Sequence, residues 1–166
     1  MRLHRVAWTL ALVAVAVPAS AQARRAAAAG QPDFKAMVQR YWDVWGAGDL
    51  DKAAAMYAKD SDLVFYDLEP LKYNGWDRYR QGVVPNILAK FEKVAFHLND
   101  DLKATRRGNV AWTTVTAHAS GKLKTGAPVE TDMRHTVIWE KRGPDWLIVH
   151  EHVSAPSSLP SPPPGR

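Results

Sequence analysis

The chain has 166 residues, of which 22 are Lys or Arg and 17 are Asp or Glu, so its formal net charge is +5. Five of the basic residues lie near the two ends, and the stretch from residue 33 to residue 154 carries 17 charges of each sign. A neutral central stretch lacks the positive surface of a nucleic-acid binder, and the absence of Cys excludes disulfides, a thiolate nucleophile and Cys-ligated metals.

The first 23 residues have the pattern of a secretory signal peptide. Arg2 and Arg5 precede an apolar run from Val6 to Val17, and the small residues that follow allow cleavage after Ala21 or Ala23. The apolar run is too short to serve as a membrane anchor. We therefore expect a periplasmic or secreted protein that has no membrane association after cleavage.

The rest of the chain divides into three segments by composition. Residues 24–32 are expected to form a flexible lead-in, and residues 157–166 form a Pro-rich tail that we expect to be disordered. Residues 33–156 lie between them and are enough for one domain with one hydrophobic core.

Three helices are predicted in the first half of the domain. Apolar residues follow a helical spacing after Asp33, a suitable N-cap, up to the Gly46-Ala47-Gly48 sequence that ends the helix. A shorter helix begins at Asp49-Leu50-Asp51. A third runs from Trp76 to about Lys90, with a break or kink expected at Pro85 inside it.

The remaining elements are predicted to be strands. A short strand covers residues 63–67, and four longer strands cover residues 93–106, 110–120, 129–141 and 146–154, joined by Gly-containing turns at residues 108, 121–126 and 143. Helices followed by antiparallel strands indicate an α+β fold, in which the helices cover one face of a curved sheet and leave a pocket for a small ligand.

The sequence does not decide which face of the last strand points into the core. Packing favours inward-facing Leu147, Val149 and Val153, which would take Glu151 inward with them. The alternative register turns inward the opposite face of the strand, which carries His150 and His152. A single bulge in the hairpin switches between the two arrangements.

Both ends of the domain resemble known families. The segment Gln39-Arg40-Tyr41-Trp42, followed by Gly46-Ala47-Gly48-Asp49-Leu50-Asp51, resembles the opening of the ketosteroid-isomerase/SnoaL-like group in the nuclear-transport-factor-2-like superfamily. The closing hairpin, with Gly143, Trp146 and His150-x-His152-x-Ser154, is similar to the association domain of calcium/calmodulin-dependent kinase II and its bacterial SnoaL-like relatives.

The resemblance covers about residues 34–156 and implies both a fold and an assembly. The fold is a cone-shaped, curved antiparallel sheet packed by about three N-terminal helices, a cystatin-like α+β roll that encloses a pocket. The family usually dimerises through the outer face of its sheet, so we expect a homodimer.

The resemblance also implies roles for particular residues. Tyr41 matches the helix tyrosine that donates a hydrogen bond to the dienolate oxygen in steroid isomerases, and Asp67 lies close to the position of their carboxylate base. Their second donor, a protonated Asp, falls near Val137, so a Tyr–Asp donor pair cannot form. The arginines of the kinase association domain's pocket fall on Val137 and Val153.

Two interpretations remain open for each of the candidate catalytic residues. Tyr41 is either a hydrogen-bond donor to a ligand oxygen or a core aromatic residue whose hydroxyl only reaches the cavity. Asp67 is either a general base whose pKa is raised in an apolar pocket or a loop aspartate that accepts backbone hydrogen bonds.

The candidate ligand-binding residues come from the long strands. Arg134 and Glu130 either clamp a ligand carboxylate or form an ion pair. His150 and His152 have no third metal ligand at a recognisable spacing, so we predict no metal and no cofactor. The full set of candidates is Trp112, Thr116, His118, Arg134, His150, Glu151 and His152.

Two functions follow from these patterns. The first is an exported protein with a hydrophobic pocket for a small organic molecule, with acid–base chemistry at carbon of the isomerase, cyclase or dehydratase type. In that case Asp67 or a His is the base and Tyr41 is the donor. The second is a non-catalytic ligand-binding or oligomeric assembly domain, so the sequence does not decide whether the protein is an enzyme.

Overall fold

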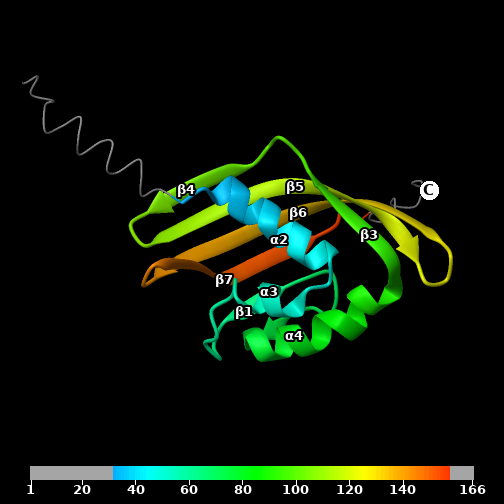
Figure 1. Ribbon diagram of the computed structural model, residues 1–166, viewed down its shortest axis with the longest axis horizontal. Helices are drawn as coiled ribbons and strands as arrows, with labels where there is room; N and C mark the ends of the chain where they lie inside the picture. Colours follow the sequence, from blue (N-terminus) through cyan, green and yellow to red (C-terminus); the bar gives the residue numbers. More distant parts are fainter. Residues whose placement is uncertain (1–31, 158–166) are drawn as a thin grey trace, which may run out of the picture. The chain divides into compact units, whose positions relative to one another are not determined.

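The computed structural model describes residues 32–157, which form an α+β domain (Figure 1). The expected signal peptide, nearly all of the lead-in and the tail after Ser157 lie outside the described residues. Among the helices within residues 32–157, none is both long enough and apolar enough to cross a membrane.

The first two helices begin and end as the sequence predicts. Helix α2 spans Phe34–Gly46, and the side chain of Asp33 caps it by accepting a hydrogen bond from the backbone N–H of Ala36 at 3.0 Å. Helix α3 spans Leu50–Ala54 and is capped in the same way by Asp49. Between them, Gly48 adopts a φ of +67°, a conformation that glycine allows at the end of a helix.

The third helix is shorter than predicted. Helix α4 spans Gly75–Asn86 with Pro85 in its last turn, and it ends at Ile87, whose φ of −123° and ψ of −68° are not helical. The predicted break thus lies just after Pro85. A short 3₁₀ helix, η1, follows at Leu88–Lys90. In Figure 1, α2 lies across one face of the sheet, and α4 lies beside the short strand β1.

The sheet has seven strands in the order β2-β1-β7-β6-β5-β3, and β4 also pairs with β5. All pairs are antiparallel except β1 with β7, which are parallel. The α+β fold class is therefore confirmed. The strands are β1 (Val64–Tyr66), β2 (Tyr73–Asn74), β3 (Phe91–Leu98), β4 (Lys103–Arg107), β5 (Val110–Leu123), β6 (Pro128–Arg142) and β7 (Asp145–Ser154).

One predicted strand is two strands in the structure. The stretch 93–106 is interrupted at residues 99–102, where the side chain of Asp101 accepts hydrogen bonds from both the backbone N–H and the hydroxyl of Thr116. This side chain takes a position on β5 that a strand backbone would otherwise occupy. The turn expected at residues 121–126 is also shorter, because β5 continues through Gly121 to Leu123.

Strand β7 contains the bulge that decides its inward face. Trp139 of β6 pairs with Ile148, the preceding residue Ile138 pairs with His150, and Val149 has no partner in β6. Before the bulge Ile148 points into the core, and after it Glu151 and Val153 do. The predicted inward placement is thus correct for Glu151 and Val153 but wrong for Leu147 and Val149.

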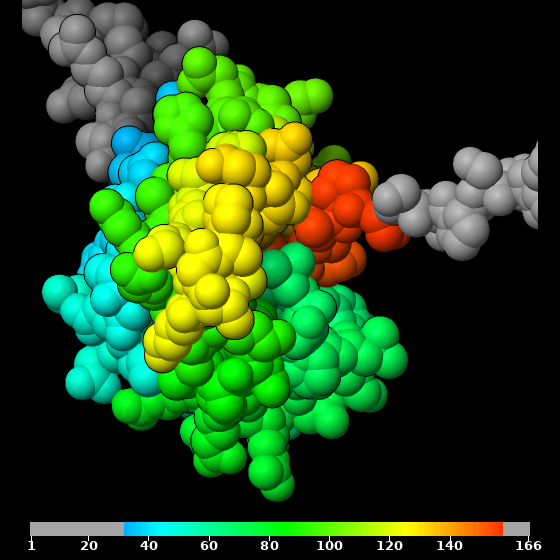
Figure 2. Space-filling model, turned by 90° about the vertical axis from the view of Figure 1, so that its right-hand side faces the viewer, coloured from blue at the N-terminus to red at the C-terminus, as the bar shows by residue number. Residues whose placement is uncertain are grey.

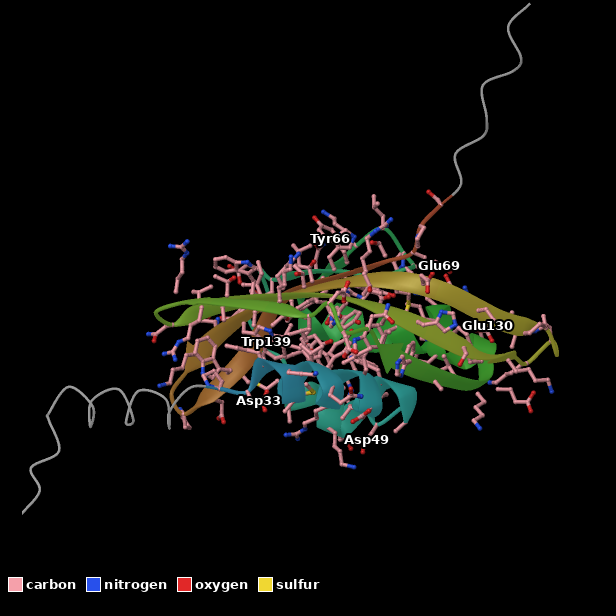
Figure 3. All side chains as sticks on the ribbon, turned by 90° about the horizontal axis from the view of Figure 1, so that it is seen from above. Asp33, Asp49, Tyr66, Glu69, Glu130 and Trp139 are labelled. Carbon is pink, nitrogen blue, oxygen red and sulfur yellow. The ribbon has the colours of Figure 1, made fainter. Side chains whose placement is uncertain are left out.

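The core lies between α2, α4 and the inner face of the sheet. On β5 the buried residues are small, and on β6 they are larger, ending with the fully buried Trp139. Figure 3 shows Trp139 on the side of the sheet that α2 covers, while Tyr66 lies on the opposite side. Figure 2 views the end of the domain where α4, the β5–β6 turn and the end of β7 come together.

Candidate functional site

A largely apolar pocket lies between the two longer helices and the inner face of the sheet. The space inside it is about 60 Å³, and its wall is formed by side chains from α2, α4, β3, β5, β6 and β7. Among these wall residues, the oxygen-bearing side chains are those of Tyr41, Asp67, Tyr79 and Thr131. An apolar cavity with a few polar groups is the usual form of a small-molecule site.

Asp67 brings a carboxyl group to this pocket from the end of β1. The hydroxyl of Tyr79 donates a hydrogen bond to Oδ2 at 2.8 Å, and the backbone N–H of Leu68 donates to Oδ1 at 2.7 Å. Burial raises the pKa of Asp67 to about 6, although both hydrogen bonds act in the opposite direction. A carboxyl with that pKa changes its protonation state near neutral pH, as a general base requires.

Tyr41 brings a hydroxyl to the same pocket from α2. Its side chain is buried, and its ring stacks on that of His135 with 4.4 Å between the ring centroids. Burial and the nearby Glu151 and Asp67 carboxyls raise the pKa of Tyr41 well above its ordinary value. The hydroxyl therefore keeps its proton and is able to donate a hydrogen bond.

A second carboxyl, that of Glu151, lies behind the pocket wall. The residue is fully buried, and the hydroxyl of Tyr57 donates a hydrogen bond to its Oε2 at 2.6 Å. Tyr57 in turn accepts a hydrogen bond from Nε1 of Trp45 at 3.2 Å. Burial, followed by the charge of Asp67, raises the pKa of Glu151 to about 8.

His135 is a further buried ionisable group next to the pocket. It stacks on Tyr41 and contacts the edge of Trp42, and neither of its ring nitrogens has a hydrogen-bond partner among residues 32–157. Burial lowers its pKa to about 3, so the imidazole is neutral at physiological pH.

Most of the predicted ligand-binding residues do not lie with Tyr41 and Asp67. Alternation along β5 turns Ala117 and its same-face neighbours inward, so Trp112, Thr116 and His118 lie on the outer face of the sheet. His118, one of the candidate ligand-binding residues, therefore lies outside the pocket wall. Of the seven predicted ligand-binding residues, Glu151 is the one whose side chain the sheet turns inward.

The outward-facing polar residues have partners of their own. Thr116 is bound to Asp101, and His118 lies between Asp132 and Glu130, with its Nδ1 2.9 Å from Asp132 Oδ1. Arg134 is exposed and, within the described part of the chain, forms no ion pair with Glu130. The expected Arg134–Glu130 pair is thus replaced by a pair between Glu130 and His118.

His150 and His152 also point away from the pocket. Nδ1 of His150 lies 2.7 Å from the backbone oxygen of Val64, and both rings lie against the edge of Tyr66. The bulge at Val149 turns them outward, against the register that would have placed them inside. Within residues 32–157, no group of three or more His, Asp or Glu side chains is arranged to hold a metal ion.

A groove on the outer surface approaches the pocket from the other side of β1. It shares Asp67, Leu68 and Val153 with the pocket, and Tyr66 and Leu71 are among its other wall residues. Asp67 thus stands between the apolar interior and a water-accessible surface.

The sequence patterns assign no role in a site to Tyr79 or Tyr57. The structure shows that their hydroxyls hold the two buried carboxyls. Their helical spacing predicts burial, but no local signal pairs Tyr57 with a glutamate 94 positions later.

Comparisons with known proteins agree with this architecture. A SnoaL-like domain family model matches residues 34–158. None of the curated proteins matches the chain significantly.

Three solved structures show the same fold, each under 25% identical in sequence. A nuclear transport factor 2-like superfamily protein from Salmonella enterica serovar Typhimurium is 18% identical, with a TM-score of 0.67 over 88% of this chain and 99% of that one. A protein from Shewanella frigidimarina, provisionally named a ketosteroid isomerase, is 19% identical, with a TM-score of 0.61 over 70% and 90%. A Xanthomonas campestris protein is provisionally named a calcium/calmodulin dependent protein kinase II association domain. It is 22% identical, with a TM-score of 0.63 over 87% and 95%.

The family model covers the whole described domain from the first residue of α2 to the end of β7 and beyond. The two resemblances noted in the sequence, at the first helix and at the closing hairpin, both correspond to structural neighbours. The chain belongs to the SnoaL-like domain family, within the nuclear-transport-factor-2-like fold.

Proposed function

We propose that the domain binds a small, largely apolar organic molecule and catalyses proton transfer at a carbon atom of it. The observation that carries this proposal is the presence of Asp67 and Tyr41 in the wall of one apolar pocket. Asp67 has a pKa of about 6, and the hydroxyl of Tyr41 retains its proton. These are the two groups that acid–base chemistry next to a carbonyl needs.

The proposed reaction begins with removal of a proton from the carbon next to a carbonyl group. The ionised Asp67 accepts that proton, and negative charge develops on the carbonyl oxygen, to which Tyr41 donates a hydrogen bond. Return of the proton from Asp67 to another carbon atom completes an isomerisation. The apolar wall excludes water, which strengthens the hydrogen bond to the developing charge.

The test measures exchange of carbon-bound hydrogen rather than a complete reaction. Cyclic ketones and hydroxy-ketones are incubated with the protein in D₂O, and deuterium incorporation is followed by mass spectrometry. We expect Asp67→Asn to reduce the exchange rate by about 10²-fold or more. The matched control is Glu69→Gln, which removes an exposed carboxyl two residues away that pairs with Lys90. Equal exchange by wild type and Asp67→Asn would contradict the proposal.

We also propose that two copies of the domain associate through the outer face of the sheet. Tyr66 of β1 and Trp112 of β5 are exposed there, at 37% and 36% of their surface. Ile138 is half-buried and belongs to β6, which lies between β1 and β5 in the sheet. Sedimentation velocity is expected to show a dimer that Ile138→Asp dissociates, whereas Lys35→Glu on α2 does not. A monomeric wild-type protein would count against the dimer and against an assembly role.

Export is a further proposal, based on the charged, apolar and small-residue segments at the N-terminus. Expression of the full chain in a Gram-negative host is expected to give a periplasmic protein. Its intact mass should correspond to a chain that starts at Gln22 or Arg24. A cytoplasmic protein that keeps Met1 or Arg2 would contradict it.

A further inference from the structure

Glu151 occupies an unusual position for a glutamate. Its side chain is fully buried on the inner face of β7, between Phe65 of the parallel strand β1 and Val137 of β6. Oε2 accepts the hydrogen bond from Tyr57, and Oε1 has no partner of ordinary hydrogen-bond geometry within the described residues. An ionised carboxylate with a bare, buried oxygen costs several kcal/mol in desolvation, so the neutral acid is the form that this site favours.

The ionisable groups that face Glu151 come from four segments of the chain. Tyr41 lies on α2, Tyr57 follows α3, Asp67 follows β1, and Tyr79 lies on α4. The neighbouring residues across the sheet, Phe65 and Val137, are apolar. Glu151 therefore faces one other acid and three tyrosine hydroxyls.

The directions of the hydrogen bonds distinguish the two carboxyls. Tyr79 donates its hydroxyl proton to Asp67, which leaves the lone pairs of the Tyr79 oxygen free to accept a hydrogen bond. Tyr41 and Tyr79 both approach Glu151 closely enough to lower its pKa. A proton on Oε1 of Glu151 can be donated to the oxygen of Tyr79, and the chain of donors then ends on Asp67, to which Tyr79 donates. The reverse arrangement, with Asp67 protonated and Glu151 ionised, would place the negative charge on the carboxyl whose Oε1 is buried without a partner, which costs additional free energy.

We propose that Glu151 is a positioning residue that remains a neutral carboxylic acid behind the tyrosines, so that Asp67 carries the single negative charge of the site. This inference rests on the proposed function, because it explains how Asp67 is kept ionised as the base. Glu151 orients Tyr57 directly and fixes the direction in which the tyrosine hydroxyls donate. It does not line the pocket, so its role is to position other residues and not to contact a ligand.

The test follows the side-chain carboxyl ¹³C chemical shifts of the two acids against pH in the wild type, Asp67→Asn and Glu151→Gln. In the wild type, Asp67 is expected to titrate at a lower pH than Glu151. Asp67→Asn is expected to lower the pKa of Glu151 by roughly one pH unit, because it removes the facing negative charge. Glu151→Gln is expected to change the pKa of Asp67 by less than about 0.3, because an amide replaces a group that is already neutral.

Two results would overturn the inference. One is that Glu151 titrates before Asp67 in the wild type, a measurement that requires no variant to fold. The other is that Glu151→Gln lowers the pKa of Asp67 by about one pH unit, which would mean that Glu151 is ionised while Asp67 titrates.

Tyr57→Phe provides an independent check of the contact, because loss of its hydrogen bond should raise the pKa of Glu151 and leave that of Asp67 unchanged. An unchanged Glu151 pKa in this variant would contradict the positioning contact. These titrations measure protonation and not turnover. If deuterium exchange shows no dependence on Asp67 while Glu151 remains the neutral acid, then the proposed function alone has failed.

Discussion

At the scale of single residues, two opposed effects determine the pKa of Asp67. Burial against apolar side chains raises its pKa, while Tyr79 and the backbone N–H of Leu68 stabilise the ionised form. The result is a carboxyl whose pKa lies near 6 rather than near 4. The groove on the other side of β1 shares this residue, so Asp67 adjoins both the apolar pocket and the outer groove.

The hydrogen bond from Tyr79 can be removed without changing the charge of the site. Tyr79→Phe is expected to raise the pKa of Asp67 above about 6, because the ionised carboxylate loses a donor and the neutral acid loses less. Carboxyl ¹³C chemical shifts measured against pH give this pKa directly.

The matched control for that change is Tyr73→Phe, which removes a hydroxyl that donates to the backbone oxygen of Glu69. It should leave the pKa of Asp67 where it is. A pKa of Asp67 that falls or does not move in Tyr79→Phe would show that the hydroxyl is not a significant partner of the carboxylate.

These residue contacts also show where prediction from the sequence ends. Tyr41 and Asp67 were identifiable because each stands near a position that a related family uses, and the structure brings both to one pocket. The positions of Tyr57, Tyr79 and His135 correspond to no family position noted in the sequence. Their roles depend on contacts between segments far apart in the chain, which local patterns do not encode.

At the scale of elements, the N-terminal caps of the first two helices were predictable from the sequence, while the face of strand β7 that points into the core was not. Asp33 and Asp49 begin helices because an aspartate side chain satisfies a free N–H at a helix start, which is a local interaction. The inward placement of Glu151 depends on a one-residue bulge at Val149. A bulge reflects pairing with β6, and both registers of β7 give a plausible alternation of apolar residues.

Gly121 offers a test of how closely β3 and β5 must approach. A Cβ atom at this position would lie 2.3 Å from the backbone oxygen of Lys93, so Gly121→Ala forces the two strands apart. We expect a loss of about 1–3 kcal/mol in the free energy of unfolding, measured as a lower urea midpoint.

Gly46→Ala is the control for that substitution, because a Cβ atom there meets nothing closer than 3.4 Å from the side chain of Phe96. It should cost little. Similar losses in both variants would mean that the close approach of β3 to β5 is not what Gly121 provides.

At the scale of the whole molecule, the buried ionisable groups make stability depend on pH. Asp67 and Glu151 have folded-state pKa values of about 6 and about 8, above the ordinary values of 3.8 and 4.5. Each binds more protons in the folded state within its window, so the free energy of unfolding falls as pH rises through it. His135, with a pKa lowered from 6.5 to about 3, acts in the opposite direction between those two values.

Between pH 7 and pH 8, Asp67 in the folded protein and His135 in the unfolded chain are largely deprotonated, while Glu151 is still titrating. The free energy of unfolding should therefore fall by about 1 kcal/mol across this range, as measured by urea denaturation at several pH values. Glu151→Gln should remove most of the fall. His118 also has a raised pKa, caused by Asp132 and Glu130, and it loses its charge as pH rises, so His118→Gln is the matched control. If His118→Gln flattens the profile and Glu151→Gln does not, the pH dependence originates on the outer face of the sheet and not in the buried pair of carboxyls.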